Sequence, residues 1–212
     1  CVDNEATKNE ESEDFEEYCE LRDGEHHFYL SKGCGRKWMN ESDDTRGSAG
    51  LFCLWPITSN HNYREALKAA KNGESPNNIS PIIRYSTSKS ASFLWMGDLE
   101  TDFQEAIKDV VVWAKVDILF APHHGRDSGK IPEVVLQKLS PKIIVIGEAP
   151  SDTLNYYNDY NTITQNSAGD ITFECVDNKV HVYVSSDTYT VDYLKNDKRS
   201  NTHGYYIGTL NV

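Results

Sequence analysis

Residues 92 to 126 constrain the fold of this chain more than any other segment. The stretch begins with a hydrophobic strand, Phe93 to Met96, which is followed by a Gly-Asp step. A helical pattern and a second hydrophobic strand, Val116 to Phe120, come next, and a Pro-His-His-Gly turn closes the stretch. Strand, helix and strand in this order are typical of an open α/β sheet. We therefore expect an α/β fold built around these two strands.

Polar side chains follow both strands directly. Asp98 comes just after the first strand, and His123 and His124 come just after the second. Open α/β sheets place their ligand sites at these strand ends. A carboxylate with an imidazole suits a divalent ion such as zinc or manganese. Asp98 alone is also compatible with a helix entry and the histidines with an ordinary turn, but their joint occurrence favours a metal site.

The segment between the strands predicts a helix. Thr101 is expected to be its N-cap, with Gln104 at capping-box spacing. Apolar residues then recur at intervals of three and four positions, which predicts one face packed on a sheet. These residues are Leu99, Phe103, Ile107, Val110, Val111 and Ala114.

MGDLE, followed by LFAPHHGRDSG, resembles the metallo-β-lactamase superfamily. The similarity is closest to the hydrolase domain of ComEC-like DNA-uptake competence proteins. It extends upstream through LFCLWP and NNISPIIRYS and downstream through LSPKIIVIGEAP, and it covers residues 50 to 185 approximately. The resemblance implies an αββα sandwich, in which two β-sheets lie face to face with helices outside.

The same resemblance implies a centre of two divalent metal ions, zinc or manganese. Asp98 matches the carboxylate that bridges the two ions, and His124 matches the late histidine ligand, with His123 as the alternative. Arg126 is suited to a bidentate contact with a phosphate oxygen, although a surface arginine is equally compatible. Asn78 matches an Asn-rich step beside the metal centre, although it can also be a turn residue.

The family's principal metal-binding loop, His-x-His-x-Asp-His, does not occur in this sequence. His26-His27 and His61 do not fit its pattern. A catalytic metal needs about three protein ligands, so two are too few. We therefore expect residues 26 to 212 to be the C-terminal half of such a domain, completed by a separate N-terminal fragment that carries the loop.

Residues 1 to 25 are expected to be an acidic, mobile linker or tail. They contain eleven acidic residues but only two basic ones, Lys8 and Arg22. A run of like charge with few apolar residues is typical of a solvated linker. Because the sequence starts at Cys1, the interpretation is that a protease cuts the chain here and regulates activity.

The remaining composition narrows the class of protein. The net charge of −12 argues against a general phosphate-binding surface, although a local basic pocket remains compatible. Five cysteines without paired spacing favour free thiols in the cytoplasm. No apolar run is long enough to span a membrane.

The leading hypothesis is a metal-dependent hydrolase of phosphodiesters, with DNA as the substrate that the resemblance implies. The alternative is a metallo-β-lactamase-fold interaction module whose catalytic activity has decayed, which the missing ligand loop motivates. Further strands are expected at residues 26–30, 51–55, 81–86, 142–146, 171–176, 180–185 and 189–193, and further helices at 64–72 and 132–139.

Overall fold

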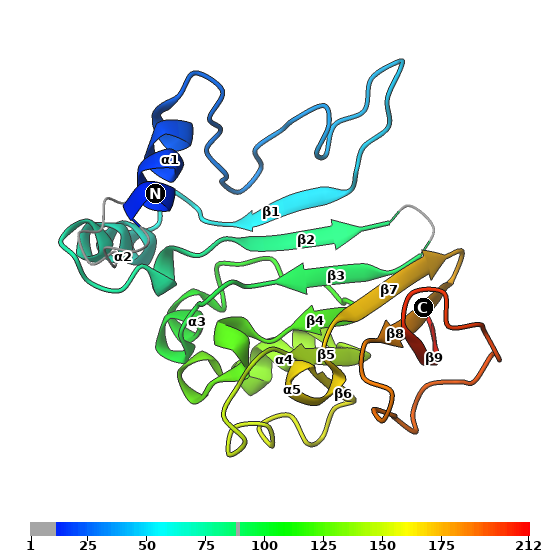
Figure 1. Ribbon diagram of the computed structural model, residues 1–212. Helices are drawn as coiled ribbons and strands as arrows, with labels where there is room; N and C mark the ends of the chain where they lie inside the picture. Colours follow the sequence, from blue (N-terminus) through cyan, green and yellow to red (C-terminus); the bar gives the residue numbers. More distant parts are fainter. Residues whose placement is uncertain (1–11, 88–89) are drawn as a thin grey trace.

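The computed structural model describes residues 12 to 87 and 90 to 212, and it has three layers (Figure 1). A six-stranded sheet lies in the middle, helices cover one face, and a three-stranded sheet packs on part of the other. The six strands, in sheet order, are β1 Leu51–Trp55, β2 Ile82–Ser86, β3 Ser92–Trp95, β4 Ile118–Phe120, β5 Ile143–Ile146 and β6 Thr162–Thr164. The smaller sheet consists of β7 Ile171–Val176, β8 Lys179–Val184 and β9 Tyr205–Asn211.

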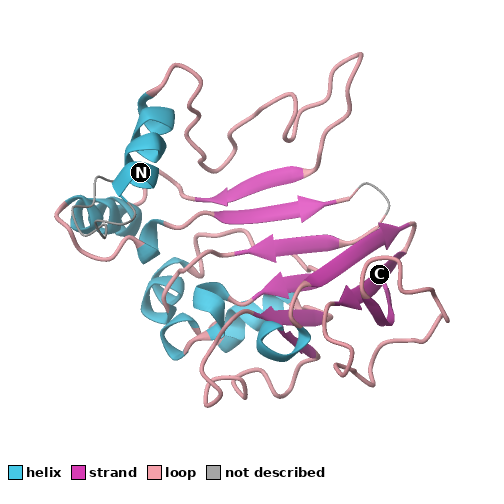
Figure 2. Ribbon diagram, viewed as in Figure 1, coloured by secondary structure: helices cyan, strands magenta, loops and turns pink. Residues whose placement is uncertain are grey.

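The helices are short (Figure 2). The α-helices are α1 Ser12–Asp23, α2 His61–Lys71, α3 Thr101–Ile107, α4 Glu133–Leu139 and α5 Gln165–Ala168. Of these, α2, α3 and α4 connect strands that are neighbours in the larger sheet. Three 3-10 turns are η2 Asn77–Ile79, η3 Pro122–Gly125 and η4 Asp127–Gly129. In the described part of the chain, no helix is both long enough and apolar enough to cross a membrane.

The strands from β3 to β6 are parallel, whereas β1 and β2 are antiparallel to their neighbours. Helix α3 connects β3 to β4, and α4 connects β4 to β5, so each connection returns the chain to the start of the next strand. The carboxyl ends of these strands therefore lie along one edge of the sheet, where open α/β sheets bind their ligands.

Both faces of the central strands are apolar because both faces are covered. Leu94 and Leu119 are paired in register and face the helices, where they are fully buried. Phe93 and Ile118 are also paired in register and face the smaller sheet, whose strand β8 supplies Val180, Val182 and Val184 to that core. The architecture is thus mixed α/β, compatible with the α+β arrangement expected from the sequence.

The predicted capping of α3 is wrong. The N-cap is Glu100, and its side chain makes no capping hydrogen bond. Thr101 instead donates its hydroxyl hydrogen to the carbonyl oxygens of Ser128 and Lys130, at 3.1 and 2.8 Å. The Gln104 amide donates to the carbonyl oxygens of Leu99 and Gly129. Both side chains therefore tie α3 to the loop that follows the histidine pair.

Helix α3 is also shorter than its apolar pattern predicts. It ends at Ile107, although Val111 is still buried in the core. The run Val110 to Val112 consists of β-branched residues, which are poor helix formers. The Trp113 indole donates to the carbonyl oxygen of Lys108 at 2.7 Å, which satisfies a backbone group just beyond the helix end.

Two predicted strands are not strands. Residues 26 to 30 are irregular, and the side chain of Tyr29 is 70% exposed. Residues 189 to 193 bind the sheet through side chains: the Tyr193 hydroxyl donates to the Thr162 carbonyl oxygen, and the Tyr189 hydroxyl accepts from the Thr164 amide. The edge strand β6, which the sequence pattern did not predict, is held by these two tyrosines.

Residues 12 to 23 of the acidic segment form a helix, and residues 1 to 11 lie outside the described part, so the expectation of a mobile linker or tail stays a prediction. Glutamates favour helices, and the charges suit the helix dipole, with Glu13 and Asp14 in the first turn and Arg22 in the last. The Phe15 and Tyr18 rings stack one turn apart, 6.0 Å between centroids. Local propensity therefore outweighs like-charge repulsion in this stretch.

Asp117 gives the fold a pH-dependent stability that can be measured. Burial raises the pKa of this carboxyl, but hydrogen bonds from Lys142 and Ser92 outweigh burial and hold the pKa below its ordinary value. The stabilisation is therefore complete above the unfolded-state pKa of about 3.9 and is lost as the pH falls through the folded-state pKa. We expect Asp117→Asn to lower the free energy of unfolding by about 1.5–3 kcal/mol at neutral pH.

Urea unfolding between pH 7 and pH 3 tests this prediction, because the difference between wild type and Asp117→Asn should shrink towards the acid end. Asp109→Asn is the matched control, since Asp109 is 78% exposed and 3.6 Å from Lys138. It should change the free energy of unfolding by less than about 0.5 kcal/mol. A pH-independent effect at Asp117 would contradict the assigned cause.

Candidate metal centre

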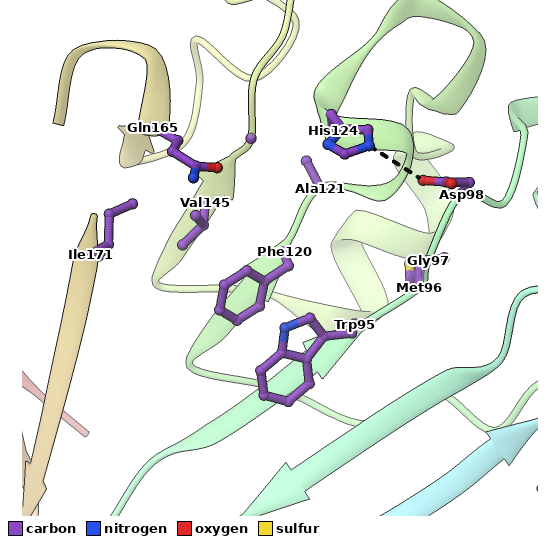
Figure 3. Close-up of a pocket in the computed structure, with 11 residues that line it drawn as sticks. Trp95, Met96, Gly97, Asp98, Phe120, Ala121, His124, Val145, Gln165 and Ile171 are labelled. Carbon is purple, nitrogen blue, oxygen red and sulfur yellow. Dashed lines mark ion pairs between the residues drawn. The ribbon is translucent and has the colours of Figure 1, made fainter. Parts of the chain in front are cut away.

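Asp98 and His124 meet at the carboxyl edge of the parallel strands (Figure 3). Asp98 follows β3, and His124 follows β4, the next strand in the sheet. The His124 Nε2 lies 3.9 Å from the Asp98 Oδ1, and both side chains are about half exposed. The two potential ligands that the sequence places 26 positions apart are therefore neighbours in space.

The separation of these two atoms suits ligands of one ion better than a direct bond. At 3.9 Å it is too long for a hydrogen bond. Two ligands of one tetrahedral zinc ion, each about 2.1 Å from the metal, lie about 3.4 Å apart. A movement of about 0.5 Å would bring the pair to that spacing. The spacing of the carboxylate and the imidazole is thus compatible with two ligands of one ion.

The loop that carries Asp98 is fixed by a close contact with residue Ser80. Gly97 adopts a positive φ of 55°, and a Cβ at this position would lie 2.6 Å from the Ser80 Cβ. The Asp98 amide donates to the Ser80 Oγ at 3.1 Å. Only glycine therefore allows the backbone to approach closely enough for this hydrogen bond.

Asn78 acts on the same loop from the η2 turn. Its amide oxygen accepts from the Glu100 backbone N–H, and its amide nitrogen donates to the Glu100 carboxylate at 2.9 Å. Asn77 donates to the other oxygen of that carboxylate. Asn78 does not line the cavity at the site. Asn78 therefore stabilises the loop through Glu100, two residues after Asp98.

The histidine turn has an unusual backbone conformation. His123 (φ 50°), His124 (φ 60°) and Gly125 (φ 87°) all adopt positive φ values in succession. Each non-glycine residue in this region costs on the order of 1–2 kcal/mol. The His123 N–H donates to the Gly97 carbonyl oxygen at 2.9 Å, which joins the turn to the Asp98 loop. Strain that surrounding contacts maintain is characteristic of functional sites, and it favours a functional role for this turn.

The two histidines have different surroundings. The His123 Nδ1 lies 2.9 Å from the Ser128 hydroxyl, so this ring is held by the following loop. The His124 ring lines the cavity beside Asp98, and His123 does not. Arg126 is exposed and lies outside the cavity lining. The structure thus brings His124 to Asp98 and places His123 and Arg126 beside the site.

A cavity of about 370 Å³ opens beside the Asp98–His124 pair. Its opposite side is largely aromatic and apolar, because the Trp95 and Phe120 rings stack there with centroids 4.7 Å apart. The Gln165 side chain lies at the rim (Figure 3). The lining is completed by Met96, Gly97, Ala121, Val145, Gly147 and Ile171. Sequence reasoning placed Trp95 and Phe120 in strands but did not identify them as cavity residues.

The described residues do not complete a metal site. Among residues 12–87 and 90–212, no cluster of three or more His, Cys, Asp or Glu side chains is placed to hold an ion. Asp98 and His124 supply two donors, and a catalytic metal takes about three from protein. This donor set fits part of a metal centre, so further ligands must come from elsewhere if an ion binds here.

Comparison with known proteins adds no family assignment. No model of a known protein family matches the chain, and no curated protein matches it either.

Gly125 provides a test of how tightly the turn is held. Gly125→Ala places a Cβ 2.7 Å from the Cγ2 of the fully buried Ile146. Gly73→Ala is the matched control, because Gly73 has a similar φ of 88° but no atom within 4 Å of a new Cβ. Both variants carry the backbone cost of about 1–2 kcal/mol, and only Gly125→Ala adds a collision.

We expect Gly125→Ala to lower the free energy of unfolding by at least about 1 kcal/mol more than Gly73→Ala does. It should also shift the NMR signals of the His124 ring, whereas Gly73→Ala should leave them unchanged. Equal effects of both substitutions would show that the turn is not constrained by β5.

Proposed function

We propose that this chain is part of a metal-dependent hydrolase of phosphodiesters, with DNA as the substrate that the resemblance implies. The observation that carries the proposal is the placement of Asp98 and His124, 3.9 Å apart at the ends of neighbouring parallel strands. The strained histidine turn supports a functional role. The resemblance of the sequence blocks to the metallo-β-lactamase superfamily supports the reaction class.

The residues of this chain have distinct roles in the proposal. Asp98 supplies an anionic oxygen and His124 a neutral imidazole nitrogen, and these donors suit zinc or manganese. A pair of such ions lowers the pKa of a bound water and stabilises the charge of an in-line displacement. Arg126, exposed two positions after His124, is within the same loop and can approach a phosphate oxygen of the substrate.

The missing ligands are proposed to come from a partner that carries the His-x-His-x-Asp-His loop of the resembled family. The larger sheet leaves room for a further layer. Among the described residues, strand β1 contributes none to the core between the two sheets, whereas β3 to β6 contribute the apolar residues on that face. Figure 1 shows β1 and β2 on the side of the sheet away from β7, β8 and β9. A second β-layer from the partner would cover this region.

The charge of the chain limits how it can bind DNA. A net charge of −12 offers no general attraction for a phosphate backbone. Binding energy must therefore come from contacts at the cavity itself, and the proposed reaction is a local one on a short stretch of substrate.

Asp98→Asn in the complete protein tests the metal-dependent reaction. The substitution keeps the shape of the side chain but removes the charge that would bind the ion, so we expect hydrolysis of bis(p-nitrophenyl) phosphate to fall at least about 100-fold. Bound metal, measured by mass spectrometry, should fall with it, while the melting temperature of the metal-free protein stays unchanged.

Asp102→Asn is the matched control, because Asp102 is an exposed carboxylate in the first turn of α3. It should keep both activity and metal. Full activity and metal content in Asp98→Asn would contradict the proposal. A wild-type protein that binds neither metal nor a partner with the missing ligands would favour the interaction-module alternative.

The histidine pair supplies a separate prediction. His124→Ala should reduce metal content and activity more than His123→Ala, because His124 lines the cavity and the His123 ring is held by Ser128. Parallel measurement of zinc and manganese content in the two variants checks the order. The reverse order would assign the ligand to His123 and leave the site in place.

A further inference from the structure

The wall of the cavity away from Asp98 is a preformed aromatic surface. Trp95 and Phe120 stack with an interplanar angle of 14°. The Phe93 and Trp95 rings are nearly parallel, with centroids 5.9 Å apart, and the Phe173 ring meets Phe93 and Phe120 edge-on. These contacts fix the ring orientations, so a ligand that stacks here does not have to order them.

The aromatic residues that line the cavity are more exposed than the one behind them. Phe93 is only 5% exposed and belongs to the core between the sheets. Trp95 and Phe120 are partly exposed and line the cavity. Figure 3 shows their rings on one side of the pocket and the Asp98–His124 pair on another. Trp95 and Phe120 therefore keep part of their surface open to the cavity, where a ligand can contact them.

Gln165 adds a polar group to the same space. It is the first residue of α5, directly after the end of β6, and its amide lies at the cavity rim (Figure 3). An amide group offers both a donor and an acceptor, which suits the edge of a ligand that carries both. The cavity thus combines a flat apolar wall, an amide and, at its other end, the carboxylate–imidazole pair.

We propose that Trp95, Phe120 and Gln165 form a subsite for a nucleobase next to the scissile phosphodiester. This inference rests on the proposed hydrolase function and specifies its substrate. A nucleobase has a flat face that stacks on aromatic side chains and an edge with donors and acceptors that a glutamine amide can bind. The cavity of about 370 Å³ has room for a single base.

A covering protein layer is the competing occupant of this wall. A purely apolar partner surface would bury Gln165 together with Asp98 and His124, and polar groups buried without partners are costly. A base can stack on the aromatic wall and at the same time form hydrogen bonds with the Gln165 amide. Stacking also supplies affinity beyond the local phosphate contact of Arg126, because a chain with a net charge of −12 offers no general phosphate-binding surface.

The experiment compares two probes in the complete protein: a thymidine dinucleotide, and the same phosphodiester between two abasic sugars. The readouts are quenching of tryptophan fluorescence and the KM for hydrolysis. Trp95→Leu is compared with Trp38→Leu, since Trp38 is 56% exposed and lies outside the cavity lining. The dinucleotide should quench wild type and Trp38→Leu but not Trp95→Leu, and the abasic probe should quench none of them.

The KM for the dinucleotide should rise about 5- to 150-fold in Trp95→Leu, as expected for one lost base-stacking contact. The KM for the abasic probe should not change. Trp95→Phe keeps a ring and should retain most of the affinity. Gln165→Ala should raise the KM for the dinucleotide alone, which keeps the test valid if Trp95→Leu unfolds.

Three results separate this inference from the proposed function. Equal KM values for both probes in every variant would overturn the base subsite and leave the hydrolase in place. Quenching through Trp95 without hydrolysis would support the subsite and contradict the hydrolase. If acrylamide fails to reach Trp95 in the complete protein, a protein layer covers the wall and the inference is overturned.

Discussion

The parallel pairing of β3 with β4 is the interaction on which the rest of the structure depends. It sets Phe93 opposite Ile118 and Leu94 opposite Leu119, so each pair lies on one face of the sheet. A slip by one residue would exchange the faces and separate each side chain from its own core. The same pairing places the end of β3 beside the end of β4, which brings Asp98 to His124. Core and candidate site are therefore consequences of one register.

The site loops are stabilised by each other more than by regular structure. The His123 amide binds the Gly97 carbonyl oxygen, Thr101 binds the carbonyl oxygens of Ser128 and Lys130, and Gln104 binds that of Gly129. These hydrogen bonds connect residues 97 to 104 with residues 123 to 130. Such a set of contacts offsets the cost of two left-handed histidines, each of which would relax in an isolated loop.

The two strand-end ligand candidates were predictable from sequence because their positions follow from where each hydrophobic strand stops. The aromatic wall of the cavity, Trp95 and Phe120, was not predictable from sequence. The face of the sheet to which these side chains point depends on the register of β3 with β4 and on the position of the smaller sheet. Thr101 shows a further limit: its spacing suits a helix cap, but carbonyl oxygens 27 and 29 residues away compete for the same hydroxyl. Tyr193 similarly binds β6 with its hydroxyl instead of forming a strand. Long-range hydrogen bonds of this kind leave no periodic pattern.

The incomplete donor set has a thermodynamic consequence. Asp98 and His124 are already close to ligand spacing, so binding an ion would require little free energy to rearrange them. Two protein donors alone, however, would give the ion only a low affinity. If the remaining donors lie on a partner, each of the two binding events supplies what the other lacks. By linkage, the ion then strengthens association of the partner by the same factor by which the partner strengthens binding of the ion. The Asp98–His124 pair, with its atoms 3.9 Å apart, is therefore where metal binding would be coupled to association of the partner.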